Sequence, residues 1–294
     1  MDTPADKPPT ERSSWRRGLA RVATIGAICY AAWCLALYVK QDGMIFPRQY
    51  TGAPMKDEAI PRVVERLWIE RDPGVRVEGW LVRPTTAPGG RAPLVVLFHG
   101  NAELIDASLG RAMAYVARGW AVLMPEFRGY GRSGGTPSQD ATVADAVALI
   151  ERTAACEGVD ATTLVLHGRS LGGGVAAQVA ARLTPDYHLA GLILESSFRS
   201  VASMAAGFGV PAFVVRHPFR TDRVLPGLSC PILLLHGTGD DIIPPSNSQT
   251  LAGLNPRARL VLLPGGHNDF PGNETAYWRE IDRTLAEIPA ARAR

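Results

Sequence analysis

Short, almost wholly apolar runs alternate with longer segments of helical spacing through most of this 294-residue chain. Most of the short runs cannot form helices, and their uniform apolarity is typical of strands covered on both faces of a sheet. These runs are 66–70, 77–83, 94–100, 120–126, 164–168, 189–195, 231–237 and 259–265. The segments with helical spacing are 103–118, 140–153, 171–183, 246–254 and 273–288. Strands that alternate with helices predict an α/β fold with a mostly parallel eight-stranded sheet flanked by helices.

Two segments depart from this alternation. The first two runs are joined by RDPGVR, residues 71–76, which predicts an antiparallel hairpin at the edge of the sheet. Between the strands at 189–195 and 231–237 the chain contains VASMAAGFGVPAFVV, which is apolar but offers no strand of its own. We interpret residues 197–229 as a small lid insertion over a cleft.

An uncharged stretch of 18 residues, from Val22 to Val39, precedes the α/β pattern. As a helix it would reach ~27 Å, enough to cross a bilayer. Arginines at 16, 17 and 21 precede it, so the positive-inside rule predicts a cytoplasmic N-terminus and a catalytic domain on the outer, periplasmic or lumenal side. A cleaved signal peptide and a buried core helix are alternatives, but the run exceeds the usual signal-peptide core and lacks a convincing small-x-small cleavage site.

The chain therefore divides into a basic cytoplasmic tail at 1–21, a transmembrane anchor at 22–39, a juxtamembrane connector at 40–60 and an α/β domain at 61–294. Of the formal net charge of +3, residues 1–21 supply +2. No stripe of lysine and arginine interleaved with aromatics is present in the sequence, which argues against nucleic acid as a partner. The four cysteines lack metal-ligand spacing and are expected to be buried thiols, although a Cys156–Cys230 bridge stays open.

The pentapeptide G-R-S-L-G, residues 168–172, follows one apolar run and precedes a segment of helical spacing. A sharp strand-to-helix turn crowds the backbone around its central residue, and the flanking glycines avoid side-chain clashes there. Such a turn exposes the hydroxyl of Ser170 and aims the amide of Leu171 at the same place. We predict Ser170 as a nucleophile; an ordinary glycine-rich turn is the structural alternative.

A serine hydroxyl is a weak nucleophile and needs a base that is itself oriented by an acid. HGTGDDIIP places Asp240 directly after the run at 231–237, and PGGHNDF places His267 after the run at 259–265. The carboxyl ends of parallel strands meet at one edge of a sheet. We therefore predict Asp240 as the acid and His267 as the base.

Other residues could occupy these roles. Three alternative acids are Asp241, which is adjacent to Asp240, Asp269, which lies close to His267 in the sequence, and Glu195, which ends the previous strand at 189–195. Three further histidines, each followed by glycine, end predicted strands, and we expect packing or local hydrogen bonding for them: His99, His167 and His236. The loop HGNAE after the strand at 94–100 would turn the backbone amide of Asn101 toward the reacting carbonyl oxygen, so Asn101 and Leu171 form the predicted oxyanion hole.

The motifs FHGNA, PEFRGYGRSGGTPSQ, GRSLGG, HGTGDDIIP and PGGHNDF, in this order, resemble the α/β-hydrolase superfamily. Within it the chain is similar to membrane-anchored serine hydrolases related to the α/β-hydrolase-domain-containing lipases and protein depalmitoylases and their bacterial relatives. The resemblance covers about residues 40–290 and implies the same catalytic set of Ser170, Asp240 and His267. One departure is Glu126 in PEFRGYG, where aspartate is commoner, and only a structural consequence is expected.

The sequence thus predicts a membrane-anchored serine hydrolase that cleaves carboxylic ester or thioester bonds, with a lipid or acyl ester as substrate. A peptidase or amidase using the same three residues is one alternative. A catalytically idle scaffold with this fold is another. No metal or organic cofactor is expected, because the acyl-transfer mechanism needs only side chains and backbone amides.

Overall fold

A computed structural model describes residues 11–85, 90–183 and 187–288. The chain separates into two compact units, Met1–Gln41 and Asp42–Arg294. Residues 1–10 of the predicted basic tail lie outside the described residues.

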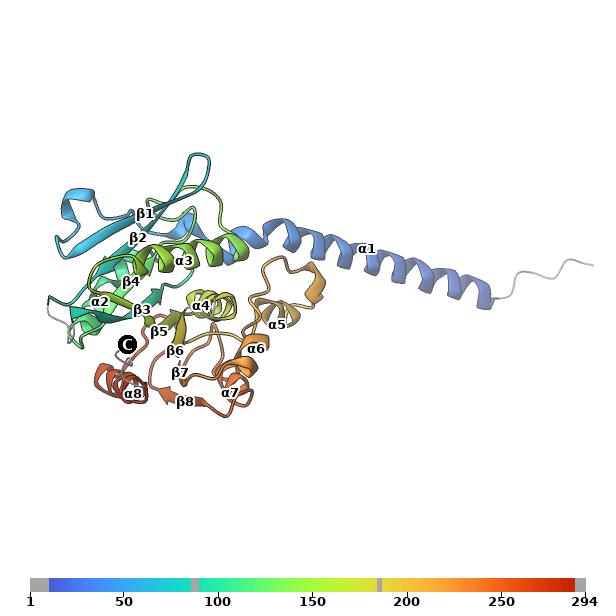
Figure 1. The fold of residues 1–294 in the computed structure, drawn as a ribbon. Helices are drawn as coiled ribbons and strands as arrows, with labels where there is room; N and C mark the ends of the chain where they lie inside the picture. The colour runs from blue at the N-terminus through green and yellow to red at the C-terminus, as the bar shows by residue number, and fades with distance from the viewer. Residues whose placement is uncertain (1–10, 86–89, 184–186, 289–294) are drawn as a thin grey trace, which may run out of the picture. The chain divides into compact units, whose positions relative to one another are not determined.

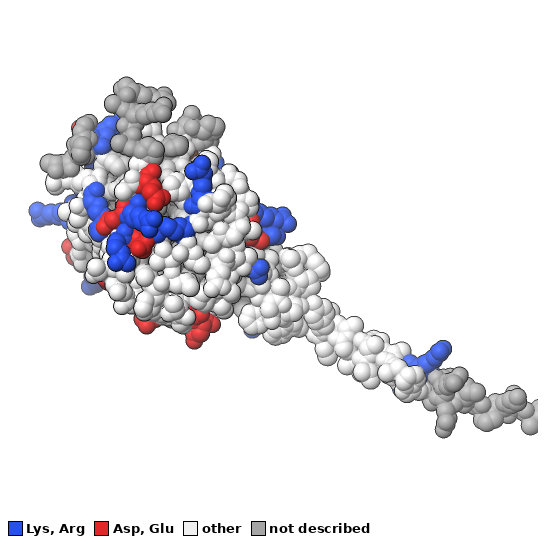
Figure 2. Space-filling view, turned by 90° about the horizontal axis from the view of Figure 1, so that it is seen from below, with Lys and Arg blue, Asp and Glu red and all other residues white. Residues whose placement is uncertain are grey.

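The first unit contains most of helix α1, Glu11–Ile45. The part from Trp15 to Ile45 has a mean hydropathy of 1.9 and is long and apolar enough to cross a membrane. None of its apolar window is buried, which contradicts the core-helix alternative. Figure 2 shows a long stretch of this helix without charged side chains. A signal sequence meets the same criteria of length and composition, so the uncleaved anchor stays a prediction.

The second unit is built on one eight-stranded sheet with the order β1-β2-β4-β3-β5-β6-β7-β8 (Figure 1). The strands are β1 Val64–Asp72, β2 Val75–Val82, β3 Ala92–Phe98, β4 Ala121–Pro125, β5 Val159–Arg169, β6 His188–Glu195, β7 Ile232–Gly237 and β8 Ala258–Leu263. The β1–β2 and β2–β4 pairs are antiparallel and the remaining pairs are parallel. The predicted strands and the edge hairpin are confirmed.

Helices cover both faces of this sheet, and each face has its own hydrophobic core. The helices are α2 Leu109–Val116, α3 Gln139–Ala154, α4 Leu171–Arg182, α5 Val201–Ala206, α6 Thr221–Val224, α7 Ser246–Ala252 and α8 Glu274–Ala286. In β3, Leu94 and Val96 pack into the core shared with α3 and α4, whereas Val95 and Leu97 pack into the core shared with α2 and α8. Burial on both sides explains why the strands read as continuous apolar runs.

Short 3-10 helices occupy several connections, at Arg48–Tyr50, Asp57–Ala59, Ile105–Ser108, Ala212–Val214 and Leu225–Gly227. The prediction of one helix over 103–118 is wrong in its first part, because α2 begins only at Leu109. Leu104 has an extended backbone, and the Glu103 side chain turns back to accept a hydrogen bond from the Gly100 amide at 2.8 Å. This bond gives Glu103 a role in the loop that follows β3.

Segment 196–229 contains short helices but no strand, as the sequence predicts. Cys156 and Cys230 both carry free thiols, so the bridge that the sequence left open does not form. Of the four cysteines only Cys230 is buried, so the expectation of buried thiols is wrong for the other three. Near the start of the second unit, Phe46 is buried and packs against segment 196–229. Its ring centroid lies 5.5 Å from that of His217.

Candidate active site

The three residues predicted to form the catalytic set follow three parallel strands at one edge of the sheet. Ser170 follows β5, Asp240 follows β7 and His267 follows β8. Between β5 and β7 lies β6, parallel to both. The parallel topology thereby brings together residues that are up to 97 positions apart in the sequence.

These side chains form one line of hydrogen bonds. His267 Nε2 lies 3.0 Å from Ser170 Oγ, and His267 Nδ1 lies 2.7 Å from Asp240 Oδ2. The carboxylate accepts a hydrogen bond from Nδ1–H, which leaves Nε2 unprotonated and able to accept a hydrogen bond from the serine hydroxyl. All three are at least nine-tenths buried, so the contacts are shielded from water. This geometry can transfer the hydroxyl proton to the imidazole when a carbonyl carbon is attacked.

The backbone around Ser170 has the strained turn that the pentapeptide predicts. Ser170 has φ 52° and ψ −117°, a conformation that residues with a side chain rarely adopt. A Cβ atom at Gly168 would lie 2.1 Å from the Gly172 carbonyl oxygen, and one at Gly172 would lie 2.3 Å from the Phe98 carbonyl oxygen. Glycine is thus required at both positions by close backbone contact.

The acid is also held in place. Asp240 Oδ1 accepts the backbone amides of Ile242 at 3.1 Å and Ile243 at 2.7 Å, which leaves Oδ2 for His267. Of the alternative acids, Asp241 is exposed, and Asp269 accepts the Gly266 amide at 2.6 Å and so shapes the loop that carries the histidine.

The other strand-end histidines are buried and engaged locally, as expected. His236 Nε2 donates to the Ile243 carbonyl at 2.7 Å, and Nδ1 accepts from Ser248 Oγ at 2.7 Å. These bonds hold the loop after β7, which carries Asp240. His167 Nδ1 accepts from the Tyr115 hydroxyl at 2.9 Å. Burial lowers the pKa of His167 and of His236, so both rings are neutral near pH 7.

His99 lies under the loop that carries Asn101. Its Nδ1 donates to the Gly100 carbonyl at 2.8 Å, and its Nε2 lies 2.8 Å from Glu126 Oε1. Burial by itself lowers the pKa of His99, but the Glu126 carboxylate outweighs it and raises the pKa. Glu126 also accepts the Phe127 amide at 3.0 Å, so its role is structural.

Within the described residues no protein acceptor takes the amide of Asn101 or Leu171, and both stay available to an oxyanion.

A buried polar cluster beside the site has no counterpart among the sequence predictions. At its centre is Glu195, the last residue of β6, whose Oε2 accepts from Arg111 Nη1 at 2.7 Å and from the Tyr277 hydroxyl at 2.9 Å. Arg169, next to the serine, places Nε 3.3 Å from Oε1 of the same carboxylate. The position of Glu195 at a strand end was visible in the sequence, but nothing there signalled Arg111 or Tyr277 as its partners.

Acidification should destabilise the fold through this carboxylate. Burial by itself raises the pKa of Glu195, but the charge of Arg111 and the contacts with His167 and Arg169 lower it to about 2. Because the folded pKa lies below the unfolded one, this group stabilises the fold above pH ~4.5 by about 3 kcal/mol and loses that contribution as the pH falls toward 2.

Urea unfolding at neutral pH and near pH 3 tests this expectation on the wild type and on Glu195→Gln. The variant should be less stable at neutral pH, because Arg111 loses its counter-charge, and should lose less stability on acidification. An equal loss on acidification in both proteins would contradict the assignment.

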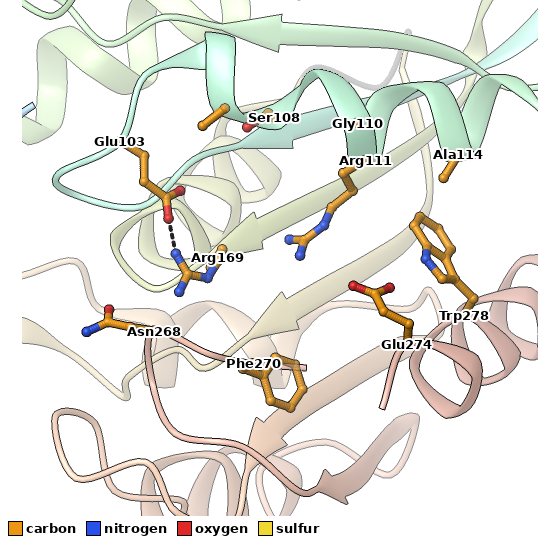
Figure 3. A pocket seen from close by; sticks show the side chains of 11 residues that line it. Glu103, Ser108, Gly110, Arg111, Ala114, Arg169, Asn268, Phe270, Glu274 and Trp278 are labelled. Atoms are coloured by element: carbon orange, nitrogen blue, oxygen red, sulfur yellow. Dashed lines mark hydrogen bonds and ion pairs between the residues drawn. The ribbon is translucent and has the colours of Figure 1, made fainter. Parts of the chain in front are cut away.

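A pocket of about 480 Å³ adjoins the site. Arg111, Arg169, Asn268, Glu274 and Trp278 are among its lining residues, and Ser170 and His267 are not. Figure 3 shows the Arg111 and Glu274 side chains pointing into it, with Arg169 joined to Glu103 at one side.

In the described part of the chain, no cluster of three or more histidine, cysteine or carboxylate side chains is arranged to hold a metal ion.

Comparisons with known proteins agree with this architecture. A family model described as serine aminopeptidase, S33, matches residues 90–228. The α/β hydrolase domain-containing protein WAV2 of Arabidopsis thaliana is 30% identical over 259 residues, which cover 80% of this chain and 82% of WAV2.

Two solved structures share the fold. Est1E of Butyrivibrio proteoclasticus, with ferulic acid bound, has a TM-score of 0.64 at 19% identity and covers 75% of this chain and 99% of its own. The esterase Pf2001 of Pyrococcus furiosus has a TM-score of 0.62 at 17% identity and covers 81% of this chain and 97% of its own. The match to WAV2, together with the strand order and the turn at Ser170, confirms the resemblance to the α/β-hydrolase superfamily inferred from the motifs. The chain belongs to the α/β-hydrolase superfamily.

Proposed function

We propose that this protein is a serine hydrolase that cleaves carboxylic ester or thioester bonds of lipid or acyl substrates through an acyl-enzyme. The observation that carries the proposal is the line of hydrogen bonds from Ser170 through His267 to Asp240, with distances of 3.0 and 2.7 Å. The esterase Pf2001 of Pyrococcus furiosus shares this fold, which supports ester chemistry for this site.

In the first step Ser170 Oγ attacks the carbonyl carbon while His267 Nε2 takes its proton. The negative charge on the carbonyl oxygen is stabilised by the amides of Asn101 and Leu171, and Asp240 stabilises the imidazolium. His267 then returns the proton to the leaving alcohol or thiol, which leaves an ester on Ser170. Water activated by the same imidazole attacks that ester, and His267 protonates Ser170 Oγ as the acid is released.

The proposal of a lipid or acyl substrate rests on two apolar features. Helix α1 is long enough to cross a membrane, and the proposed lid at 197–229 exposes two large aromatic side chains, Phe208 at 71% and Phe213 at 88%. Exposed apolar side chains in this segment and an apolar N-terminal helix favour an acyl chain over a polar substrate.

The proposed orientation has the N-terminus in the cytoplasm and the catalytic unit on the outer side, because arginines precede the apolar run. Protease added to the outside of intact spheroplasts should digest the catalytic unit. Protection outside and digestion only after lysis would reverse the orientation.

Turnover of p-nitrophenyl esters of increasing chain length by the full chain in detergent micelles tests the proposed activity. We expect the rate of hydrolysis to increase with acyl length. We also expect an acyl adduct that can be trapped at low pH and detected by mass spectrometry. Absence of both turnover and adduct across the series would contradict the proposal.

Aminopeptidase activity is a second candidate, because the family model that matches residues 90–228 is described as serine aminopeptidase. Amino-acid p-nitroanilides in the same assay separate the two. Turnover of the anilides that exceeds turnover of the esters would favour a peptidase.

A further inference from the structure

The side chain of Arg169, the residue before the proposed nucleophile, contacts three groups from separate parts of the chain. Its Nη2 donates to the His267 carbonyl at 2.6 Å, its Nη1 donates to the Glu103 carboxylate, and its Nε lies 3.3 Å from Glu195 Oε1. The guanidinium thereby donates two hydrogen bonds through Nη1 and Nη2, and its Nε lies within ion-pair distance of a buried carboxylate.

Two of these contacts join the loops on which the proposed reaction depends. Glu103 Oε2 accepts the Gly100 amide at 2.8 Å, so the loop that carries Asn101 is tied to Arg169 through Glu103. The His267 carbonyl ties the histidine loop to the same guanidinium. A continuous polar chain runs from Gly100 to His267 and bypasses the serine hydroxyl, the imidazole ring and the Asp240 carboxylate.

The third contact fixes this chain to the scaffold. Glu195 is fully buried and is held by Arg111 and by Tyr277. The backbone carbonyl of Glu195 also accepts the Ser170 amide at 2.8 Å. Glu195 therefore contacts Arg169 through its carboxylate and holds the backbone of Ser170 through its carbonyl. Through Arg169 the positions of the two loops are thus fixed relative to Ser170.

We infer that Arg169 is a positioning residue that sets the distance between the imidazole of His267 and the oxyanion amide of Asn101. The inference rests on the proposed function, because it describes the geometry of that reaction. Arg169 acts through the Glu103 carboxylate and the His267 carbonyl and touches no reacting atom. A misplacement of about 1 Å in a reacting group lowers turnover by on the order of 10²-fold. Loss of these contacts should therefore cause a large decrease in kcat.

The first test compares Arg169→Ala with wild type in hydrolysis of p-nitrophenyl butyrate. We expect kcat to fall by about 10²-fold with KM changed by less than about threefold. Arg169→Lys should recover part of kcat, because an ammonium can still reach one of the three acceptors.

Chemical rescue gives a readout that a general loss of packing would not produce. Arg169 lines the pocket of about 480 Å³, so the space left in Arg169→Ala is open to a small cation. Guanidinium at millimolar concentration should raise kcat of Arg169→Ala several-fold and should leave wild type unchanged. Rescue by guanidinium but not by sodium would support the inference.

The matched control is Arg118→Ala. Arg118 pairs with Asp282 at 2.6 Å and stacks on Trp278, and it contacts neither loop. Its removal should leave kcat within about twofold. A fall in kcat for Arg118→Ala equal to that for Arg169→Ala, or an Arg169→Ala enzyme within about threefold of wild type, would overturn the inference.

Hydrogen exchange measures the same positioning without turnover. Peptides that contain residues 99–104 and 265–270 should both exchange faster in Arg169→Ala and should be unchanged in Arg118→Ala. If Arg169→Ala fails to fold, Glu103→Gln takes its place, with faster exchange expected at both loops. Unchanged exchange at 265–270 in that variant would overturn the inference. If wild type shows no turnover while exchange responds as stated, the proposed function fails and the structural linkage holds.

Discussion

Replacement of His267 by alanine is expected to lower kcat for a p-nitrophenyl ester by on the order of 10⁵–10⁶-fold. His267 is the group within 3.0 Å of the Ser170 hydroxyl that can take its proton, and its ring is fixed by Asp240 at 2.7 Å. Without it no side chain takes the proton from the hydroxyl, so the attack of Ser170 on the ester and the later attack of water on the acyl-enzyme both become slow. Steady-state turnover with active-site titration measures the effect.

The control for this substitution is Asp241→Asn, which removes an acidic group next to Asp240 that is exposed and lies outside the hydrogen-bonded line. Its kcat should stay within about twofold of wild type. A His267→Ala enzyme that retains more than about a hundredth of wild-type kcat would show that another group acts as base.

Replacement of Gly168 by alanine is expected to destabilise the fold by more than about 4 kcal/mol. The added Cβ would lie 2.1 Å from the Gly172 carbonyl oxygen and 2.6 Å from the Gly173 amide nitrogen, and both belong to backbone that cannot move aside without opening the first turn of α4. Loss of soluble folded protein, or a urea midpoint lowered by that amount, is the expected result.

Gly110→Ala serves as the matched control. Gly110 lies in α2 with no heavy atom within 4 Å of a Cβ atom built there. Alanine favours a helix over glycine by up to about 1 kcal/mol, so this variant should be as stable as wild type or more so. A Gly168→Ala protein as stable as Gly110→Ala would mean that the turn is not as tight as described.

Much of the fold could be predicted because its strongest signals are local. Strands buried on both faces are uniformly apolar. In the turn at Ser170, Gly168 and Gly172 stand where a Cβ atom would clash with another backbone segment. The positions of Asp240 and His267 followed from one topological rule, that parallel strands end at the same edge. These inferences needed no knowledge of side-chain contacts.

The cluster around Arg169 could not be predicted in the same way. Its members come from α2, the ends of β5 and β6, and α8, and none of these positions carries a periodic or motif signal that pairs it with another. The start of α2 was misplaced for a related reason, because the Glu103 side chain bonds to Gly100 and holds the chain out of a helix. Such choices depend on contacts formed only in the folded unit.

The central claim is that Ser170 is a nucleophile made reactive by His267. Incubation of the full chain with a fluorophosphonate, followed by intact-mass measurement and peptide mapping, tests it directly. We expect one phosphonyl group per chain, on Ser170, with no adduct in Ser170→Ala and a greatly slowed reaction in His267→Ala. An unlabelled wild-type chain, or an adduct mapped to a different residue, would contradict the claim.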